Sequence, residues 1–186
     1  MRGSKRALGI VAGPRCSGNT TALVGEVLRG AGDAGWETEL RCLGALSINP
    51  LAACASDEPF GVAGPEDDMR LLYPFLEAMG AFVFGSPIYY DHVSAQAKIF
   101  IDRLHHYSKE GTRGLLPRGV AAVVVITYEW DRPGAYSGVA EWLRGRLEHY
   151  WGMRVVATLE AEGTVKRPVA DRHDLLKRAY EIGRGL

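Results

Sequence analysis

With 186 residues, 47% of them hydrophobic and 24% charged, the chain has the length and composition of one soluble domain, which we assign to residues 1–186. Its 22 basic and 22 acidic side chains give a formal net charge of zero, which argues against nucleic acid as the main partner, because such a partner usually needs a basic face. No apolar run approaches the roughly 20 residues of a membrane span, so we expect no membrane association and a cytoplasmic location.

Apolar runs and helical patterns alternate along the chain. Short apolar runs bounded by turn residues predict buried strands, and apolar residues at helical spacing predict amphipathic helices. The run at 119–127 is almost uninterrupted, as is typical of a central parallel strand that helices cover on both faces. An irregular segment occupies 44–64. In chain order we expect strand 6–12, helix 21–32, strand 36–43, helix 65–76, strand 81–85, helix 94–107, strand 119–127, helix 136–152, strand 153–160 and helix 171–184.

This succession of five β-α units predicts a parallel sheet with helices on both faces and right-handed crossovers. The common arrangement of five such strands is an α/β, flavodoxin-like three-layer sandwich with strand order 2-1-3-4-5. A ligand of this fold binds outside the carboxyl ends of strands 1 and 3, where the strand order reverses. We therefore expect the chemistry just after residue 12 and just after residue 85.

The sequence GPRCSGNT, residues 13–20, joins the first expected strand to the first helix. Backbone N–H groups at a helix N-terminus are unpaired, and the helix dipole favours an anion there. The segment fits the phosphate loop of triphosphate-binding proteins except that Asn19 stands where the lysine belongs. We therefore expect it to bind a single terminal phosphate group; the alternative is a helix cap with glycines for the turn. The candidate ligands are Arg15, Ser17, Gly18, Asn19 and Thr20.

Two further loops at the same sheet edge carry aromatic side chains. The loop that follows the third strand contains Tyr89 and Tyr90, and the loop after the fourth contains Tyr128 and Trp130. A flat heteroaromatic ring prefers aromatic or apolar walls, with backbone amides at its edge. These residues therefore indicate a ring-binding site, with packing over the sheet end as the alternative interpretation.

These motifs resemble those of a known family. GPRCSGNTTAL is similar to the GSPRxxGNTxxL phosphate loop of the NADPH-dependent FMN reductase family. FGSPIYYDHVSAQAKIFIDR resembles the second flavin loop of its iron–sulfur flavoprotein branch. The resemblance implies bound FMN, redox activity and a homodimer or homotetramer. It also implies that Arg15, Ser17, Asn19 and Thr20 hold the FMN phosphate and that Pro87, Ile88, Tyr89 and Tyr90 line the isoalloxazine ring.

The chain departs from that family at two places. Gly13 replaces the first serine of the phosphate loop, which removes one hydroxyl donor. The iron–sulfur branch has a compact cysteine cluster where this chain has INPLAACASDEPF, with Cys54 as its one cysteine. A cubane cluster needs about four thiolates, so we expect no iron–sulfur centre and no metal site.

The remaining reactive or charged residues are interpreted as structural. The odd and scattered set of Cys16, Cys42 and Cys54 defines no disulfide framework, so we expect reduced thiols. Asp67 is interpreted as complementing a helix dipole, and Arg103 as making helix-surface or subunit contacts.

The leading functional hypothesis is an oxidoreductase that passes hydride from NADPH or NADH, via bound FMN, to a small acceptor such as a quinone, an azo compound or a flavin. Because the cofactor carries the chemistry, no side chain is assigned as catalytic. One alternative is an FMN-binding electron-transfer protein without NAD(P)H oxidase activity, although such carriers are usually strongly acidic. A second is a nucleotide-binding regulatory domain without redox chemistry.

Overall fold

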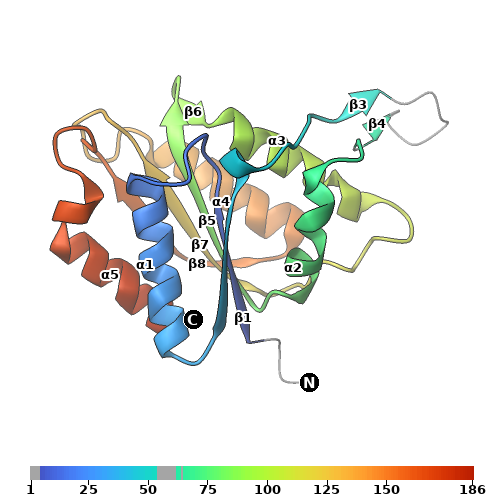
Figure 1. Cartoon of the computed structure of the whole chain (residues 1–186), viewed down its shortest axis with the longest axis horizontal. Coiled ribbons are helices and arrows are strands. Elements are labelled where there is room, and N and C mark those ends of the chain that lie inside the picture. Colours follow the sequence, from blue (N-terminus) through green and yellow to red (C-terminus); the bar gives the residue numbers. More distant parts are fainter. Residues whose placement is uncertain (1–4, 54–61, 64) are drawn as a thin grey trace.

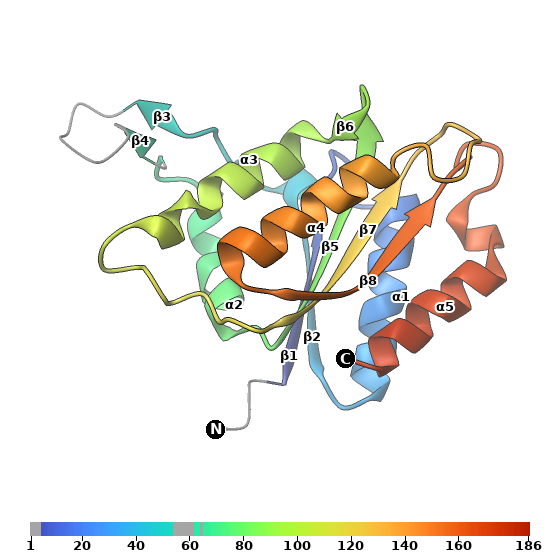
Figure 2. The ribbon, with the colours of Figure 1, turned by 180° about the vertical axis from the view of Figure 1, so that it is seen from behind.

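The structure is a computed structural model that describes residues 5–53, 62–63 and 65–186. A central parallel sheet lies between two layers of helices, and Figures 1 and 2 show it from opposite sides. The fold class and the strand order predicted from the sequence are confirmed. In spatial order the strands are β2 (Glu37–Cys42), β1 (Arg6–Val11), β5 (Ala81–Tyr89), β7 (Ala121–Thr127) and β8 (Arg154–Ala161).

The helices divide between the two faces of the sheet, and each face has its own core. In the core on the α3 side, the ring of Phe84 stacks on that of Phe100 with a centroid separation of 5.6 Å. Strand β7 is buried almost throughout because both layers cover it. Helices α1 (Asn19–Asp33) and α5 (His173–Arg184) lie on one face, and α2 (Tyr73–Ala78), α3 (Ala95–Arg103) and α4 (Ser137–Trp151) lie on the other.

Helices α1 and α5 cross at two glycines that allow their backbones to touch. A Cβ atom on Gly183 would lie 1.9 Å from the carbonyl oxygen of Val27, and one on Gly30 would lie 2.0 Å from that of Tyr180. No L side chain fits at such distances, so the crossing requires glycine. The contact fixes the position of α1 against α5, and with it the position of the loop that precedes α1.

We expect Gly183→Ala to lower the free energy of unfolding by about 1–3 kcal/mol, because the added methyl group forces the two helices apart. Gly145→Ala in α4 is the matched control. Its Cβ would meet no heavy atom within 4 Å, so the better helix propensity of alanine should leave stability equal or higher. Urea denaturation of both variants measures the difference, and equal effects would disprove the tight crossing.

Strand β5 is longer than the sequence pattern predicted. It continues to Tyr89 because the short strand β6 (His92–Val93) pairs antiparallel with its end. Tyr90 and Asp91 form the turn with φ values of 47° and 64°, the left-handed region that a tight hairpin turn requires. The second predicted loop is therefore a rigid hairpin that extends beyond the edge of the sheet.

The segment before α2 differs from the prediction. No helix begins at Pro65; a 3-10 turn, η3 (Asp68–Leu71), precedes α2. The side chain of Asp67 caps η3 by accepting a hydrogen bond from the Met69 N–H at 3.0 Å, and it also forms an ion pair with Arg103. Both side chains of this pair are almost fully buried, so the surface role predicted for Arg103 is wrong.

The remaining elements are short. The 3-10 turn η1 (Leu43–Ala45) follows β2, and strands β3 (Ala52–Ala53) and β4 (Val62–Ala63) pair antiparallel in a two-stranded ribbon that projects from the sandwich. Two more 3-10 turns are η4 (Leu104–Ser108) and η5 (Val169–Asp171). Within the part of the chain that the structure describes, no helix is both long and apolar enough to cross a bilayer.

Candidate functional site

A cavity of about 1190 Å³ opens at the carboxyl ends of β1, β5 and β7. This is the edge at which the strand order predicted a ligand site. The residues that line the cavity come from four segments: Val11 with 13–15 and 17–20, 87–91, 127–131 with Tyr136, and 164–166. All ten residues predicted from the sequence line it, namely Arg15, Ser17, Gly18, Asn19, Thr20, Pro87, Ile88, Tyr89, Tyr90 and Tyr128.

The N-terminus of α1 faces this cavity without a side-chain cap. The capping residue is Gly18, at φ 116°, which has no side chain to accept from the first N–H groups. The first turn of α1 also contains no acidic residue. Unpaired N–H groups and an uncompensated dipole make such a terminus a site for an anion. The exposed Arg15 adds a fixed positive charge beside it.

Two predicted phosphate ligands use their side chains elsewhere. The amide of Asn19 accepts a hydrogen bond from the Val169 N–H at 2.8 Å and donates to the Thr164 carbonyl at 3.4 Å. The hydroxyl of Thr20 lies 2.6 Å from that of Thr127. The two side chains therefore fasten the start of α1 to the segment after β8 and to the end of β7. Asn19 and Thr20 could bind an anion at this terminus only through their backbone N–H groups, since their side chains are engaged.

The hairpin that the end of β5 forms with β6 carries Tyr89 and Tyr90 and is called the aromatic hairpin below. Two buried serines anchor it. Ser86 donates to the Pro87 carbonyl at 2.8 Å and accepts from the Ser94 N–H at 3.1 Å. The Ser94 hydroxyl in turn donates to the carbonyl of Ala12, at the end of β1. This network joins the hairpin to the start of the phosphate loop, so the two halves of the cavity keep a fixed separation.

The third wall contains the aromatic residues that follow β7. Tyr128 is buried and meets Tyr136 edge-on, with ring centroids 4.9 Å apart. Burial, reinforced by the negative charge of Glu160, raises the pKa of Tyr128, so its hydroxyl stays protonated. Trp130, by contrast, is half-exposed. Tyr128 therefore supports the wall, while Trp130 offers an accessible ring at its rim.

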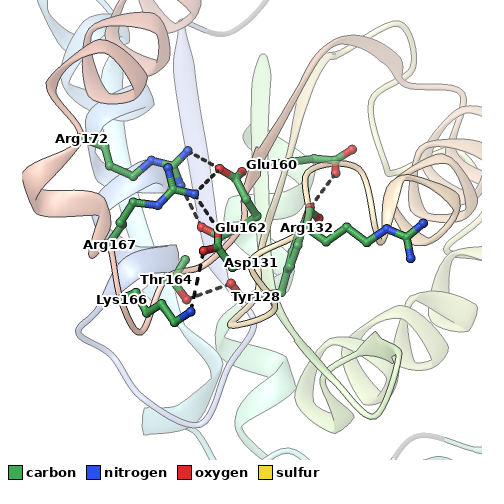
Figure 3. Close-up of polar contacts among 9 residues, drawn as sticks. All are labelled: Tyr128, Asp131, Arg132, Glu160, Glu162, Thr164, Lys166, Arg167 and Arg172. Atoms are coloured by element: carbon green, nitrogen blue, oxygen red, sulfur yellow. Dashed lines mark hydrogen bonds and ion pairs between the residues drawn. The ribbon is translucent and has the colours of Figure 1, made fainter.

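A fourth wall was missed by the sequence reasoning. It consists of Thr164, Val165 and Lys166, which follow β8. Figure 3 shows how it is fastened to the third wall: Thr164 donates to the Tyr128 carbonyl at 3.1 Å, and Arg167 reaches Asp131 at 2.8 Å. The strand order could have predicted this wall, because the residues that follow every parallel strand, β8 included, emerge at the same edge of the sheet.

Cys16 and Cys42 form a disulfide with Cα atoms 5.5 Å apart, so the prediction of reduced thiols is wrong for these two residues. The cause is the strand order. Strand β2 pairs in parallel with β1, and Cys42 lies opposite Val11 at the end of both strands. The loop after β1 consequently passes beside Cys42. Cys54 lies outside the described residues.

The fold and the cavity together define a flavodoxin-like α/β protein in which an uncapped helix N-terminus and an aromatic hairpin line one cavity. Residues 6–161 match the NADPH-dependent FMN reductase family, and the chain belongs to that family.

Its similarity to individual proteins extends over most of the chain. An iron–sulfur flavoprotein of Archaeoglobus fulgidus is 29% identical over 178 residues, which cover 96% of this chain and 77% of that protein. One from Methanocaldococcus jannaschii is 35% identical over 98 residues, covering 53% of this chain and only 51% of the relative. The solved NAD(P)H:quinone oxidoreductase from Methanothermobacter marburgensis shares the fold, with a TM-score of 0.68 at 21% identity, covering 97% of this chain and 96% of that one.

Proposed function

We propose that this protein is an NAD(P)H oxidoreductase that binds FMN and transfers hydride through it to a small acceptor such as a quinone, an azo compound or a flavin. One observation carries the proposal: the uncapped N-terminus of α1 and the aromatic hairpin face the same cavity. FMN has one phosphate and one flat ring joined by a short chain, so its two ends match these two features. Family membership supports the same cofactor.

The residues present fit FMN. The backbone N–H groups of the first turn of α1, with Ser17 and Arg15, would hold the phosphate dianion. Pro87, Ile88 and Tyr89 would line the ring, at the point where the hairpin leaves the sheet. When bound, FMN supplies the hydride chemistry itself, and the protein supplies position and electrostatics.

The chain's own residues orient the reacting partners. The buried Ser86–Ser94–Ala12 hydrogen bonds fasten the hairpin to the residue that follows β1, and so would hold the ring-binding wall in position. Tyr90 is fully exposed and Trp130 half-exposed at the cavity rim. The family resemblance placed Tyr90 against the isoalloxazine ring. Because its side chain is fully exposed, we propose instead that Tyr90, with Trp130, contacts the transient partners, the nicotinamide and then the acceptor, which bind one after the other.

The test is a visible absorption spectrum. After incubation with FMN and gel filtration, the protein should be yellow, lose its colour on addition of NADPH or NADH under nitrogen, and recover it in air. A preparation that stays colourless would contradict the proposal. A yellow protein that NADPH and NADH both fail to bleach would instead support the electron carrier.

We also propose that this chain, unlike the relatives named iron–sulfur flavoproteins, has no cluster. The sequence contains three cysteines, and Cys16 and Cys42 are joined to each other. Cys54 alone cannot replace the roughly four thiolates that a cubane requires. Iron analysis of protein purified without oxygen checks this point. The homodimer or homotetramer and the cytoplasmic location that the sequence suggested are retained as proposals, and sedimentation tests the former.

A further inference from the structure

The Cys16–Cys42 disulfide lies at the base of the candidate phosphate loop. Cys16 is exposed and Cys42 half-buried, so Cys16 is the more accessible of the two bonded residues. The neighbours of Cys16 on both sides, Arg15 and Ser17, line the cavity, whereas neither cysteine does. A thiol can therefore reach the sulfur without entering the ligand site.

A second contact couples the same two segments. A Cβ atom on Gly44, in the turn η1, would lie 2.6 Å from the carbonyl carbon and oxygen of Pro14 and 2.7 Å from the carbonyl oxygen of Gly13. The turn after β2 therefore packs directly against the loop backbone. With the disulfide closed, the loop is held at both Pro14 and Cys16 before any ligand arrives.

We propose that Cys16–Cys42 is a thiol-exchange site whose oxidation state sets the affinity of the phosphate loop. A low-molecular-weight thiolate attacks Sγ of Cys16, the more exposed of the two residues; the S–S bond breaks and Cys42 leaves as a thiolate. A second thiolate then attacks the small-molecule sulfur of the mixed disulfide; that S–S bond breaks and Cys16 leaves as a thiolate. Two thiols are oxidised to one small disulfide, and the protein disulfide is reduced to two thiols, so electrons and protons balance.

Opening the bond changes the loop and spares the rest of the fold. The sandwich is held by its two cores, so the two thiols leave the sheet intact. The segment with Arg15 and Ser17 loses its tether and must be ordered when an anion binds. Since ordering flexible groups reduces affinity, we expect about three- to tenfold weaker FMN binding in the reduced state. Linkage requires the converse: FMN makes the disulfide harder to reduce by the same factor.

This regulation rests on the proposed FMN binding, so the experiment separates the two. Air-oxidised protein is compared with protein reduced by dithiothreitol and desalted under nitrogen. FMN dissociation constants are measured by flavin fluorescence anisotropy. Cys42→Ser should show the weaker affinity before and after dithiothreitol treatment, and Cys54→Ser, which keeps the pair, should respond like the wild type. In parallel, peptide mapping after limited exposure to glutathione locates the mixed disulfide.

The expected result is weaker FMN binding on reduction, with the glutathione adduct on Cys16. Equal FMN affinities in the two states would overturn the coupling. An adduct on Cys42, or the absence of a Cys16–Cys42 linkage in the oxidised protein, would overturn the exchange site. If neither state binds FMN, the proposed function fails and the coupling with it, while the peptide map still decides the site of exchange.

Discussion

Replacing Asp67 with alanine is expected to lower the free energy of unfolding by about 3–5 kcal/mol, the largest stability effect that we predict. The Asp67 and Arg103 side chains are 4% and 3% exposed, with Nη2 of Arg103 at 3.0 Å from Oδ1 of Asp67. Without the carboxylate, a guanidinium that cannot lose its charge remains buried and unpaired. The cost is that of an uncompensated charge, which greatly exceeds the net value of the pair.

The same pair fastens both ends of the projecting ribbon segment. Arg103 donates to the carbonyl of Asn49 at 2.8 Å and to that of Pro65 at 2.9 Å. Asp67 accepts from the Asn49 N–H at 2.8 Å. Loss of the carboxylate therefore also removes the hydrogen bond that joins the two ends of the segment at Asn49 and Asp67. We expect Asp67→Ala to unfold in urea with a lower midpoint and to be cut by protease first near this segment.

Asp102→Ala is the matched control, on the same helix and next to Arg103. Asp102 is 41% exposed and pairs with Lys98, so its loss should cost less than about 1 kcal/mol. The double variant Asp67→Leu with Arg103→Met should recover much of the lost stability, because it removes both charges. Equal effects of Asp67→Ala and Asp102→Ala would refute the burial argument.

The stability that Asp67 contributes depends on pH, and the direction of that dependence follows from its pKa. Burial by itself would raise the pKa of Asp67, but hydrogen bonds from Arg103 and from the backbone N–H groups of Asn49 and Met69 outweigh it and lower the pKa below its usual value. The stabilisation is therefore present above the unfolded-state pKa and is lost as pH falls through the lower folded-state pKa. The difference between wild type and Asp67→Ala should shrink on acidification over that window.

The sequence was sufficient to predict where the cavity lies because the relevant patterns are local. Apolar periodicity defines the strands, and the strand order determines which ends meet, so Arg15 and Tyr90 could be assigned to one cavity although they are far apart in the chain. The predictions that failed, namely the reduced thiols and the surface role of Arg103, concern contacts that depend on strand register and on the direction of side chains. Cys42 meets Cys16 because β2 stops opposite Val11, and Asp67 meets Arg103 through a segment with no periodic pattern.

Asn19 shows the same limit within the motif itself. Asn19 is the first residue of α1, at the helix entry that the motif predicts, yet its side chain binds Val169 and Thr164 in the protein itself. A sequence pattern records that an amide is needed at this position but does not show which partner it binds. Among the side chains predicted to hold a phosphate, Arg15 is therefore the clearest one to test.

Arg15→Ala is expected to weaken FMN binding by about ten- to 150-fold, the 1.5–3 kcal/mol of a hydrogen bond to a charged group. Arg15 lines the cavity beside Gly18, the capping residue that leaves the first turn of α1 open. A guanidinium there can form two parallel hydrogen bonds to a phosphate, in addition to the backbone N–H groups. The fold should be unaffected, because the side chain is exposed.

Titration of the FMN-free variant, followed by flavin anisotropy, measures the change. Arg113→Ala removes the same charge from an exposed position outside the cavity and should bind FMN like the wild type. Arg15→Lys keeps the charge but loses the planar fork, so its affinity should fall between the two. Riboflavin, which lacks the phosphate, provides the sharper comparison. If the phosphate lies at Arg15, riboflavin binds the wild type and Arg15→Ala equally, whereas an equal loss for riboflavin and FMN would place the phosphate elsewhere.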